Sequence, residues 1–443
     1  MNDDEKLSKS KESGFRSFPR VFWVVVLMEF FERGSYYGLM SVLSVYMVEE
    51  VASGGLGFTK GSAGAINSTI RPLLYFLPII AGAIADRFGY RRSLLVAFTL
   101  LSMGYFLSGQ VTSYGLVFGA LLIMATGAGI FKPIISGTIA RSTNEGNSGL
   151  GFGIFYWTIN LGAFLFPLVL VNYLRTHGYP WSAIFTASAI GTGIMLIPTI
   201  FLYKEPPKPE STKTLAQVLG GAVLVLKDWR FVSMIAIYSG FWVLYFQMFD
   251  TVLWYLKAHI DMTPFDNGIN AILGAVGVDW KFKFDAEHVT VINAGTIIAL
   301  QLVISSIVKN WRALPTMIGG IAIGTSGFIL LSISASPWIF MTGIIVFSIG
   351  EMTAHPKFIS YVGLIAPEDK KATYMGYSFL YGVIGSSVGG YTGAKLYEHF
   401  VDGLNQPRTL WLIFVGLGVA TIVGLLLYDR FIALRPAKAA ETR

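Results

Sequence analysis

Two acidic residues and an arginine lie inside an apolar stretch near residue 30. Glu29, Glu32, Arg33 and Tyr36 are spaced by three, four and seven positions, so a helix places them on one face. A charge at the centre of a bilayer costs about 2.5–3.5 kcal/mol, which makes such residues functional candidates. Two carboxylates in a low-dielectric site favour holding a proton, so the cluster predicts proton binding and release. The alternative is an ion pair between Glu32 and Arg33 that only fixes helix packing.

Lys132 is another charge inside an apolar run, which extends from 113 to 140. Pro133 follows it and predicts a kink. A functional ammonium is one interpretation, and snorkelling of the side chain to an interface is the other. The glycines just before Lys132 follow no predicted strand, so they indicate close helix packing and not a nucleotide-binding loop.

Two further polar side chains of the first half lie beside aromatic residues. Asn160 follows Tyr156 by one helical turn, which suits an amphipathic ligand; a hydrogen bond that joins two helices is the alternative. Arg71 precedes Tyr75 by one turn, so both share a face. For Arg71, a position at the membrane interface is equally open.

The second half carries polar side chains in two apolar runs, Gln247 with Asp250 and Glu351 with His355. Asp250 lies near the end of its run, so solvation at the membrane surface is the alternative to a buried role. Glu351 and His355 are one turn apart, but the two-histidine spacing of metalloproteases and any serine or cofactor motif are absent. We therefore expect no metal, cofactor or enzyme activity, and an intramembrane enzyme stays a remote alternative.

The charges of the two halves have opposite signs. The first half supplies Arg33, Lys132 and Arg71, whereas the second supplies Glu351 and Asp250. A zwitterionic or anionic solute would direct its carboxylate toward the first half and an amine toward the second. Each charge-assisted hydrogen bond would contribute about 1.5–3 kcal/mol.

The elements that position these residues are predicted transmembrane helices. Of the 443 residues, 53% are apolar and 13% are charged, which is about half the charged fraction of a soluble domain. Apolar runs of about 20–28 residues cross a hydrocarbon core of about 30 Å. The sequence predicts an all-α membrane protein with twelve transmembrane helices, at 21–48, 61–85, 93–110, 113–140, 149–174, 180–203, 231–256, 289–309, 314–334, 337–365, 372–397 and 409–430.

A polar, basic segment after the sixth predicted helix divides the chain into two halves. The apolar stretch 215–226 within it is too short to span and predicts a surface helix. Two six-helix halves with a site between them at mid-membrane are typical of secondary transporters. The expected organisation is a tail at 1–20, a first half at 21–203, a linker at 204–230, a second half at 231–430 and a tail at 431–443.

The charge distribution predicts the orientation. The net charge of +7 comes from Lys and Arg residues that gather between apolar runs, mainly on the side of the N-terminus, which the positive-inside rule places in the cytoplasm. We expect both termini there, in a plasma membrane such as a bacterial inner membrane. The basic residues form no continuous face for nucleic acid. Cysteine is absent, which excludes disulfides and thiolate metal sites.

The segment between the second and third predicted helices contains Gly82, Asp86, Arg87, Gly89, Arg91 and Arg92. Its glycines permit close helix contact and a tight turn, and Asp86 is expected to cap a helix end beside the arginines. The order of these residues resembles the loop signature of the major facilitator superfamily.

Five motifs follow one another along the chain: Glu29-x-x-Glu32-Arg33 with Tyr36-Tyr37-Gly38, Tyr75-Phe-Leu-Pro78, Lys132-Pro133, Phe155-Tyr156-x-x-Ile159-Asn160-x-Gly162, and Gly350-Glu351 with Pro356. Together they resemble the proton-coupled oligopeptide transporter family of that superfamily. The resemblance implies proton-driven symport of small peptides or peptide-like solutes by alternating access, without a cofactor. We expect the protein to act as a monomer in the lipid bilayer.

The resemblance also implies roles for single residues. Glu29, Glu32 and Lys132 match a proton-coupling network, and Glu351 matches a carboxylate that faces the peptide amine. The candidate proton-coupling residues are Glu29, Glu32, Lys132 and Glu351. With the residues singled out above, the candidate substrate-binding residues are Arg33, Tyr36, Tyr37, Arg71, Tyr75, Lys132, Tyr156, Asn160, Gln247, Asp250, Glu351 and His355.

Four positions depart from the family pattern. Met40 and Phe246 stand where an arginine and a glutamate are usual, His355 replaces a small polar residue, and Ser378 replaces a tryptophan. These changes bear on selectivity for ordinary di- and tripeptides. Met40 and Phe246, with the aromatic richness of the chain, favour the alternative function, a proton-driven exporter of drugs or lipid-like molecules on the same fold.

Overall fold

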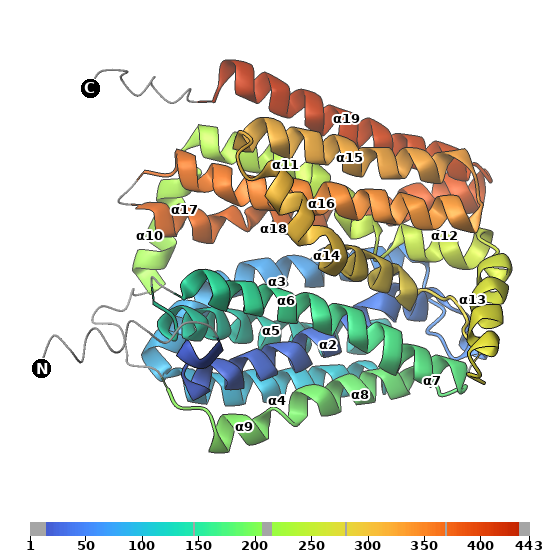
Figure 1. The fold of residues 1–443 in the computed structure, drawn as a ribbon, viewed down its shortest axis with the longest axis horizontal. Helices are drawn as coiled ribbons and strands as arrows, with labels where there is room; N and C mark the ends of the chain where they lie inside the picture. The colour runs from blue at the N-terminus through green and yellow to red at the C-terminus, as the bar shows by residue number, and fades with distance from the viewer. Residues whose placement is uncertain (1–14, 145–146, 206–214, 280, 368–369, 434–443) are drawn as a thin grey trace, which may run out of the picture.

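A computed structural model describes residues 15–144, 147–205, 215–279, 281–367 and 370–433. These residues form a bundle of long helices and contain no β-strand (Figure 1). The all-α fold is therefore confirmed. Residues 1–14 and 434–443 of the two predicted tails, and 206–214 of the predicted linker, lie outside the described residues.

The helices of the first half begin and end close to their predicted positions, because long apolar runs decide where a helix can span. Short 3₁₀ turns, η1 (Phe15–Ser17) and η2 (Val51–Ser53), flank the first helix. The helices are α2 (Arg20–Val48), α3 (Lys60–Phe88), α4 (Tyr90–Ser108), α5 (Tyr114–Arg141), α6 (Ser148–Leu165) continued by the π-helical η3 (Phe166–Val171) and α7 (Asn172–Thr176), α8 (Trp181–Gly193) and α9 (Leu196–Phe201).

The short apolar stretch that predicts a surface helix is helical, as α10 (Leu215–Leu226), while its place at the membrane surface stays a prediction. The helices that follow it are α11 (Trp229–Gln247) with α12 (Thr251–His259), α13 (Thr263–Ala275), α14 (Glu287–Val308), α15 (Ala313–Ile333), α16 (Pro337–Ile365), α17 (Lys371–Ser378) with α18 (Leu380–Tyr397) and the π-helical η5 (Glu398–Gly403), and α19 (Pro407–Phe431).

Helix α13 was not predicted. It is short, contains glycine and asparagine, and has no apolar run that would mark it in the sequence. Tertiary contacts stabilise it. The Asn270 side chain donates from Nδ2 to the Phe282 carbonyl oxygen and accepts at Oδ1 from the Phe282 backbone N–H. Asp266 accepts from the backbone N–H of Phe284 at 2.8 Å.

Nine helical segments among the described residues are long and apolar enough to cross a membrane. The other three predicted spans are α2, α4 and α17 with α18. Helix α2 carries Glu29, Glu32 and Arg33, helix α4 has Arg91 and Arg92 in its first turn, and α18 is rich in glycine, which lowers the apolar content of each segment. All three run along the length of the bundle (Figure 1), so the described helices account for the predicted twelve spans.

The helices pack in two groups that lie side by side (Figure 1). In the first group α2 contacts α6 and α8, and α4 contacts α5 and α8; in the second, α15 contacts α16 and α19, and α11 contacts α18. The groups meet where α3 packs against α18 and α6 against α14. Helix α2 begins, and α19 ends, at the end of the bundle that carries α10.

One transmembrane segment is broken inside the bundle. Helix α11 ends at Gln247 and α12 begins at Thr251, with Asp250 between them at φ −131° and ψ −91°, outside the helical region. A break at membrane depth is tolerated where protein surrounds it, and Gln247, Asp250 and Thr251 are all buried. The break frees the Asp250 carboxyl group to face the first group of helices.

Helices α15 and α16 approach closely because glycines line their contact. A Cβ atom added at Gly350 would lie 2.3 Å from the backbone nitrogen of Gly324, and one at Gly320 would lie 2.6 Å from that of Ala354. Small residues that let backbones touch are typical of helix contacts in membranes. In contrast, a Cβ atom at Gly363, on the same helix as Gly350, would meet nothing within 4 Å.

These contacts predict opposite effects of one substitution at two sites of α16. Gly350→Ala should destabilise the protein by about 1–3 kcal/mol, because the added methyl group overpacks backbone atoms. Gly363→Ala should leave stability unchanged or raise it by up to about 1 kcal/mol through helix propensity. Thermal unfolding of the purified variants in detergent measures both, and equal stability of the two would contradict the packing described.

Candidate functional site

Glu29, Glu32 and Arg33 form one buried cluster on α2. The Arg33 Nε atom lies 2.5 Å from Glu32 Oε2, Arg33 Nη2 lies 2.7 Å from Glu32 Oε1, and Nε lies 3.6 Å from Glu29 Oε1. One guanidinium thus serves two carboxylates, as the helical spacing predicts. With all three groups ionised the cluster carries one net negative charge, and a single proton neutralises it. Because an uncompensated buried charge is costly, the cluster is a candidate site for binding a proton.

Lys132 lies between α5 and α3. Its Nζ atom donates to the Leu74 carbonyl oxygen at 3.2 Å and lies 5.3 Å from the centre of the Tyr75 ring. Among the described residues it forms no ion pair. The side chain lines an internal cavity, so it does not snorkel to an interface in this conformation.

A cavity of about 90 Å³, which we name the charged cavity, lies between the two groups of helices. Three cations face it and its lining contains no acidic side chain, so it suits an anionic group. Its other walls are aromatic apart from Met40. The lining residues are Arg33, Tyr36, Tyr37, Met40, Arg71, Tyr75, Lys132, Tyr245, Phe246 and Phe249.

A larger, mostly apolar cavity of about 260 Å³ adjoins the charged cavity and shares Tyr75 and Lys132 with it. It extends toward the end of the bundle that carries α10, where α5 ends and α17 lies. Its lining residues are Leu74, Tyr75, Pro78, Ile79, Lys132, Pro133, Ser136, Gly376 and Phe379.

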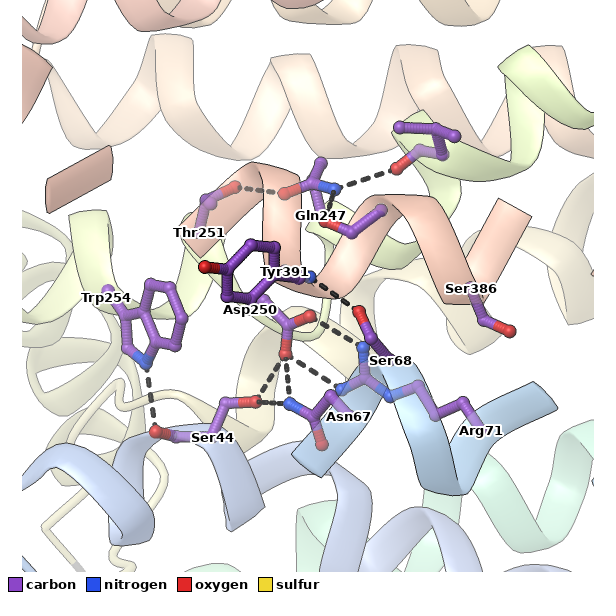
Figure 2. Close-up of polar contacts among 12 residues, drawn as sticks. Ser44, Asn67, Ser68, Arg71, Gln247, Asp250, Thr251, Trp254, Ser386 and Tyr391 are labelled. Atoms are coloured by element: carbon purple, nitrogen blue, oxygen red, sulfur yellow. Dashed lines mark hydrogen bonds and ion pairs between the residues drawn. The ribbon is translucent and has the colours of Figure 1, made fainter. Parts of the chain in front are cut away.

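Asp250 and Arg71 form a bidentate ion pair across the two groups of helices (Figure 2). Arg71 Nη1 donates to Asp250 Oδ2 at 2.6 Å and Nη2 to Oδ1 at 2.8 Å, while Asn67 Nδ2 donates to Oδ1 at 2.9 Å. The Ser44 hydroxyl also donates to Oδ1. Asp250 is 0% exposed and Arg71 is 2% exposed, so neither side chain is solvated at the surface in this conformation. The surface solvation considered for Asp250 is therefore wrong, whereas the membrane depth of Arg71 stays a prediction.

The network around Asp250 joins α2 and α3 to the broken helix of the other group. Trp254 extends it, since its Nε1 atom donates to the Ser44 carbonyl oxygen at 2.9 Å. None of Ser44, Asn67 and Trp254 is among the residues predicted from the sequence. Asn67 lies one turn before Arg71 inside an apolar run, a spacing that marks a polar face and would have drawn attention to it.

Gln247 lies outside the lining of the charged cavity. Its Nε2 atom donates to the carbonyl oxygens of Val243 and Gly389, at 2.9 and 3.1 Å, and its Oε1 atom accepts from the Thr251 hydroxyl at 3.1 Å. These bonds join α11 to α18 and occupy the amide. In this structure the Gln247 side chain therefore links two helices. Its contact with substrate stays a prediction.

Four other candidates also lie outside the lining of the charged cavity. Glu351 Oε2 accepts from Asn293 Nδ2 at 2.9 Å. His355 lies 5.3 Å, between ring centres, from Trp242. Asn160 Nδ2 donates to the Tyr156 carbonyl oxygen at 2.9 Å, within one helix, and the Tyr156 side chain is exposed.

The structure therefore brings together part of the predicted set. Arg33, Tyr36, Tyr37, Arg71, Tyr75 and Lys132 line the charged cavity, and Glu29 and Glu32 lie behind Arg33. Two departures from the family pattern, Met40 and Phe246, line it as well. Tyr245 and Phe249 were not predicted, although aromatic residues four positions apart share one helix face, and Phe246 lies three positions before Phe249.

The loop signature joins α3, α4, α5 and α9. Gly89 has φ +96°, a conformation that favours glycine. Asp86 accepts from the Tyr90 hydroxyl at 2.9 Å and from Arg141 Nη2 at 3.0 Å. The expectation that Asp86 caps a helix is wrong, because Glu205 accepts from the backbone N–H of Tyr90 at the start of α4 instead.

The arginines of this loop differ in their contacts. Arg91 donates to the carbonyl oxygens of Thr199 and Ile200, which end α9. Arg87 and Arg92 are exposed on the surface. Gly82 packs against Pro133 of α5, 3.4 Å from where a Cβ atom would lie. The signature therefore holds four helix ends together at one end of the bundle.

A sequence profile described as the Major Facilitator Superfamily matches residues 25–390. The match covers most of the chain and agrees with the two groups of helices, the site between them and the loop signature. The chain belongs to the Major Facilitator Superfamily.

Relatives with curated names include peptide transporters. The chain is 32% identical to the peptide transporter YePEPT of Yersinia enterocolitica, over 39% of this chain and 34% of the relative. It is 29% identical to a di-/tripeptide transporter of Lactococcus lactis, over 54% of this chain and 49% of the relative. An uncharacterized transporter of Bacillus subtilis, YclF, is 33% identical over 44% and 40%. The matches thus span a third to a half of these relatives.

Solved structures share the fold over nearly the whole chain. A peptide transporter POT in complex with sulfate has a TM-score of 0.76 at 20% identity, covering 97% of this chain and 98% of that one. A POT family transporter in complex with 5-aminolevulinic acid has a TM-score of 0.75 at 23% identity, covering 94% and 97%. The twelve-helix fold is thereby confirmed. The named peptide transporters among the relatives agree with the resemblance seen in the sequence.

The ion pair at Asp250 predicts strong coupling between two substitutions. Arg71→Gln and Asp250→Asn should each lower stability by about 3–5 kcal/mol, because each leaves a buried group without its partner, and the double variant should lose much less than the sum. Thermal unfolding of the four proteins in detergent measures the coupling.

The exposed ion pair between Lys60 and Asp402, 2.7 Å apart, is a matched control, because it also joins the two groups of helices, through α3 and η5. The same comparison of two single variants and the double variant at Lys60 and Asp402 should give a coupling free energy of at most about 1 kcal/mol. Additive losses at Arg71 and Asp250 would show that the buried pair does not hold the two groups together.

Proposed function

We propose that this protein is a proton-coupled symporter of small peptides or peptide-like zwitterionic or anionic solutes. One observation carries the proposal: a cavity lined by three cations lies between the two groups of helices, and Arg33 in its wall is shared by two buried carboxylates. The names of the similar relatives and structures support it. A proton-driven exporter of drugs or lipid-like molecules, the alternative from sequence, is not favoured by those names.

In this proposal the carboxylate of the solute enters the charged cavity. Arg33, Lys132 and Arg71 hold it, and the hydroxyl groups of Tyr36, Tyr37 and Tyr75 donate further hydrogen bonds. The amine faces Glu351 of the second half, near His355, Tyr156 and Asn160. Each charge-assisted bond contributes about 1.5–3 kcal/mol. Peptide side chains occupy the adjoining apolar cavity.

The proton changes which group holds Arg33. When Glu29 and Glu32 are both ionised, the guanidinium is neutralised from behind the cavity wall. Protonation of one carboxyl group weakens that hold, so that Arg33 has more of its charge available for the solute anion. Each proton moved inward supplies about 2.3 kcal/mol per 100 mV of membrane potential and about 1.36 kcal/mol per unit of pH gradient.

The two halves, residues 21–203 and 231–430, move as units around this site. The network at Asp250 closes the end of the bundle away from α10, and the apolar cavity leads toward the α10 end. We assign the α10 end to the cytoplasm, with both termini, in a plasma membrane, on the basis of the basic residues gathered there. The conformation is then closed to the outside, and the 204–230 linker joins the halves. The transporter acts as a monomer without a cofactor.

Neutralising either carboxylate separates transport from proton coupling. Glu29→Gln or Glu32→Gln should abolish accumulation driven by a pH gradient in proteoliposomes but leave measurable counterflow exchange, because exchange needs the site and no net proton movement. Glu50→Gln, which changes an exposed carboxylate just beyond the same helix, should behave like the unchanged protein. Normal concentrative uptake by both site variants would contradict the proton assignment, and no uptake of any di- or tripeptide by the unchanged protein would contradict the substrate class.

Lys132 is expected to act through its charge. Lys132→Ala should abolish pH-driven uptake of dialanine, whereas Lys132→Arg should keep part of it, because a cation stays beside Tyr75. Lys227→Ala, at an exposed position before α11, serves as the control. If Lys132→Ala transports as the unchanged protein does at every pH, the ammonium has no part in coupling.

A further inference from the structure

A further cavity lies on the outer side of the second group of helices, away from the charged cavity and its apolar neighbour. It is a groove of about 500 Å³ along α15 and the neighbouring face of α16. Its walls are apolar or small except at one end, where Trp311 and Arg312 stand. The lining residues are Trp311, Arg312, Pro315, Thr316, Gly319, Gly320, Ile323 and Thr353.

The end of the groove at Arg312 is basic. Arg312 is exposed and forms no ion pair with any described residue. Lys357 of α16 is fixed beside it, because its Nζ atom donates to the carbonyl oxygens of Trp311 at 2.9 Å and of Lys309 at 3.4 Å. Helix α15 also begins here, at Ala313, and the positive end of its dipole adds to the two side chains. The groove lining contains no acidic side chain.

The rest of the groove continues the lipid-facing surface. Ile323 in its wall, and Ile329 and Ile333 further along the same helix, are exposed apolar side chains, as expected of a helix that faces hydrocarbon. Trp311 is 57% exposed at the basic end, the position where aromatic residues mark the boundary between hydrocarbon and headgroups. A ligand of the groove therefore meets hydrocarbon along its length and the membrane surface at its charged end.

The floor of the groove is made by glycine. A Cβ atom at Gly319 would meet nothing within 4 Å, so the missing side chain leaves open space there. Its neighbour Gly320 also lines the groove and makes the close contact with Ala354 of α16. The groove thus lies beside the helix contact, where Gly319 leaves open space.

We propose that this groove binds one anionic glycerophospholipid from the leaflet at the α10 end of the bundle. The phosphate and the anionic headgroup contact Arg312 and Lys357, Trp311 lies at the level of the ester groups, and one acyl chain lies along Gly319 and Ile323. Charge complementarity selects an anion, and continuity with the lipid-facing surface selects a lipid over a soluble anion. The proposal does not depend on the solute that the protein transports.

Native mass spectrometry of the full chain, extracted in detergent and mixed with equal amounts of phosphatidylglycerol and phosphatidylethanolamine, tests the site. The unchanged protein should retain one phosphatidylglycerol in preference to phosphatidylethanolamine. Arg312→Gln should weaken this binding about tenfold or more, the loss expected for a charge-assisted contact. Gly319→Leu should abolish it, because the added side chain fills the groove.

Matched controls exist for both variants. Gly416→Leu on α19 adds the same side chain at another open, lipid-facing glycine, and Arg408→Gln removes an exposed arginine at the opposite end of the bundle. Both should bind phosphatidylglycerol as the unchanged protein does. Thermal unfolding of each variant without lipid confirms that it is folded, and Arg312→Gln supplies the test if Gly319→Leu does not fold.

Three results would overturn the proposal. Equal retention of both lipids would show that the headgroup charge is not recognised. Equal loss in site and control variants would show that the bound lipid is distributed over the surface. Displacement of phosphatidylglycerol by millimolar inorganic phosphate would show that the basic end takes a soluble anion and that the groove contributes no lipid contact.

Discussion

Every charge buried in this helical bundle needs a partner, because moving an ion from water to an apolar interior costs several kcal/mol that pairing or hydrogen bonds must recover. Two clusters meet this need differently. Glu29, Glu32 and Arg33 satisfy one another on a single helix. Asp250 takes its partners from two helices of the other group, with Arg71 as its cation. The first cluster can therefore change its proton content without moving a helix, whereas the second cannot be separated unless the groups move apart.

The charged cavity connects the two clusters. Arg33 and Arg71 both line it, and each is already held by carboxylate groups outside the lining. In the proposed function an anionic solute competes with those carboxylates for the same cations. At Arg33 that competition depends on a proton, and at Arg71 it depends on the arrangement of the two halves. Coupling between proton, solute and conformation thus needs no further component than these shared cations.

Close packing by small residues gives this coupling a rigid frame. Glycines let α15 and α16 touch along their backbones, and Gly64 and Gly390 do the same where α3 meets α18. Gln247 adds a hydrogen bond between α11 and α18. Packed helices deform little, so in the proposed function a change at one buried charge would move whole helices. Gly319 lies beside such a contact, and the absence of a side chain there leaves open the groove that we propose to bind a lipid.

The sequence by itself determined the features that depend on neighbours along one helix: the apolar runs that span, and the common face of Glu29, Glu32 and Arg33. Its motifs also indicated the family. Only the tertiary structure decided that Arg71 meets Asp250, that Gln247 ties two helices together and that Glu205, not Asp86, caps α4. The physical reason is that helical periodicity relates residues three or four positions apart, whereas contacts between helices depend on their rotation and axial register. Those are set by the packing of the whole bundle.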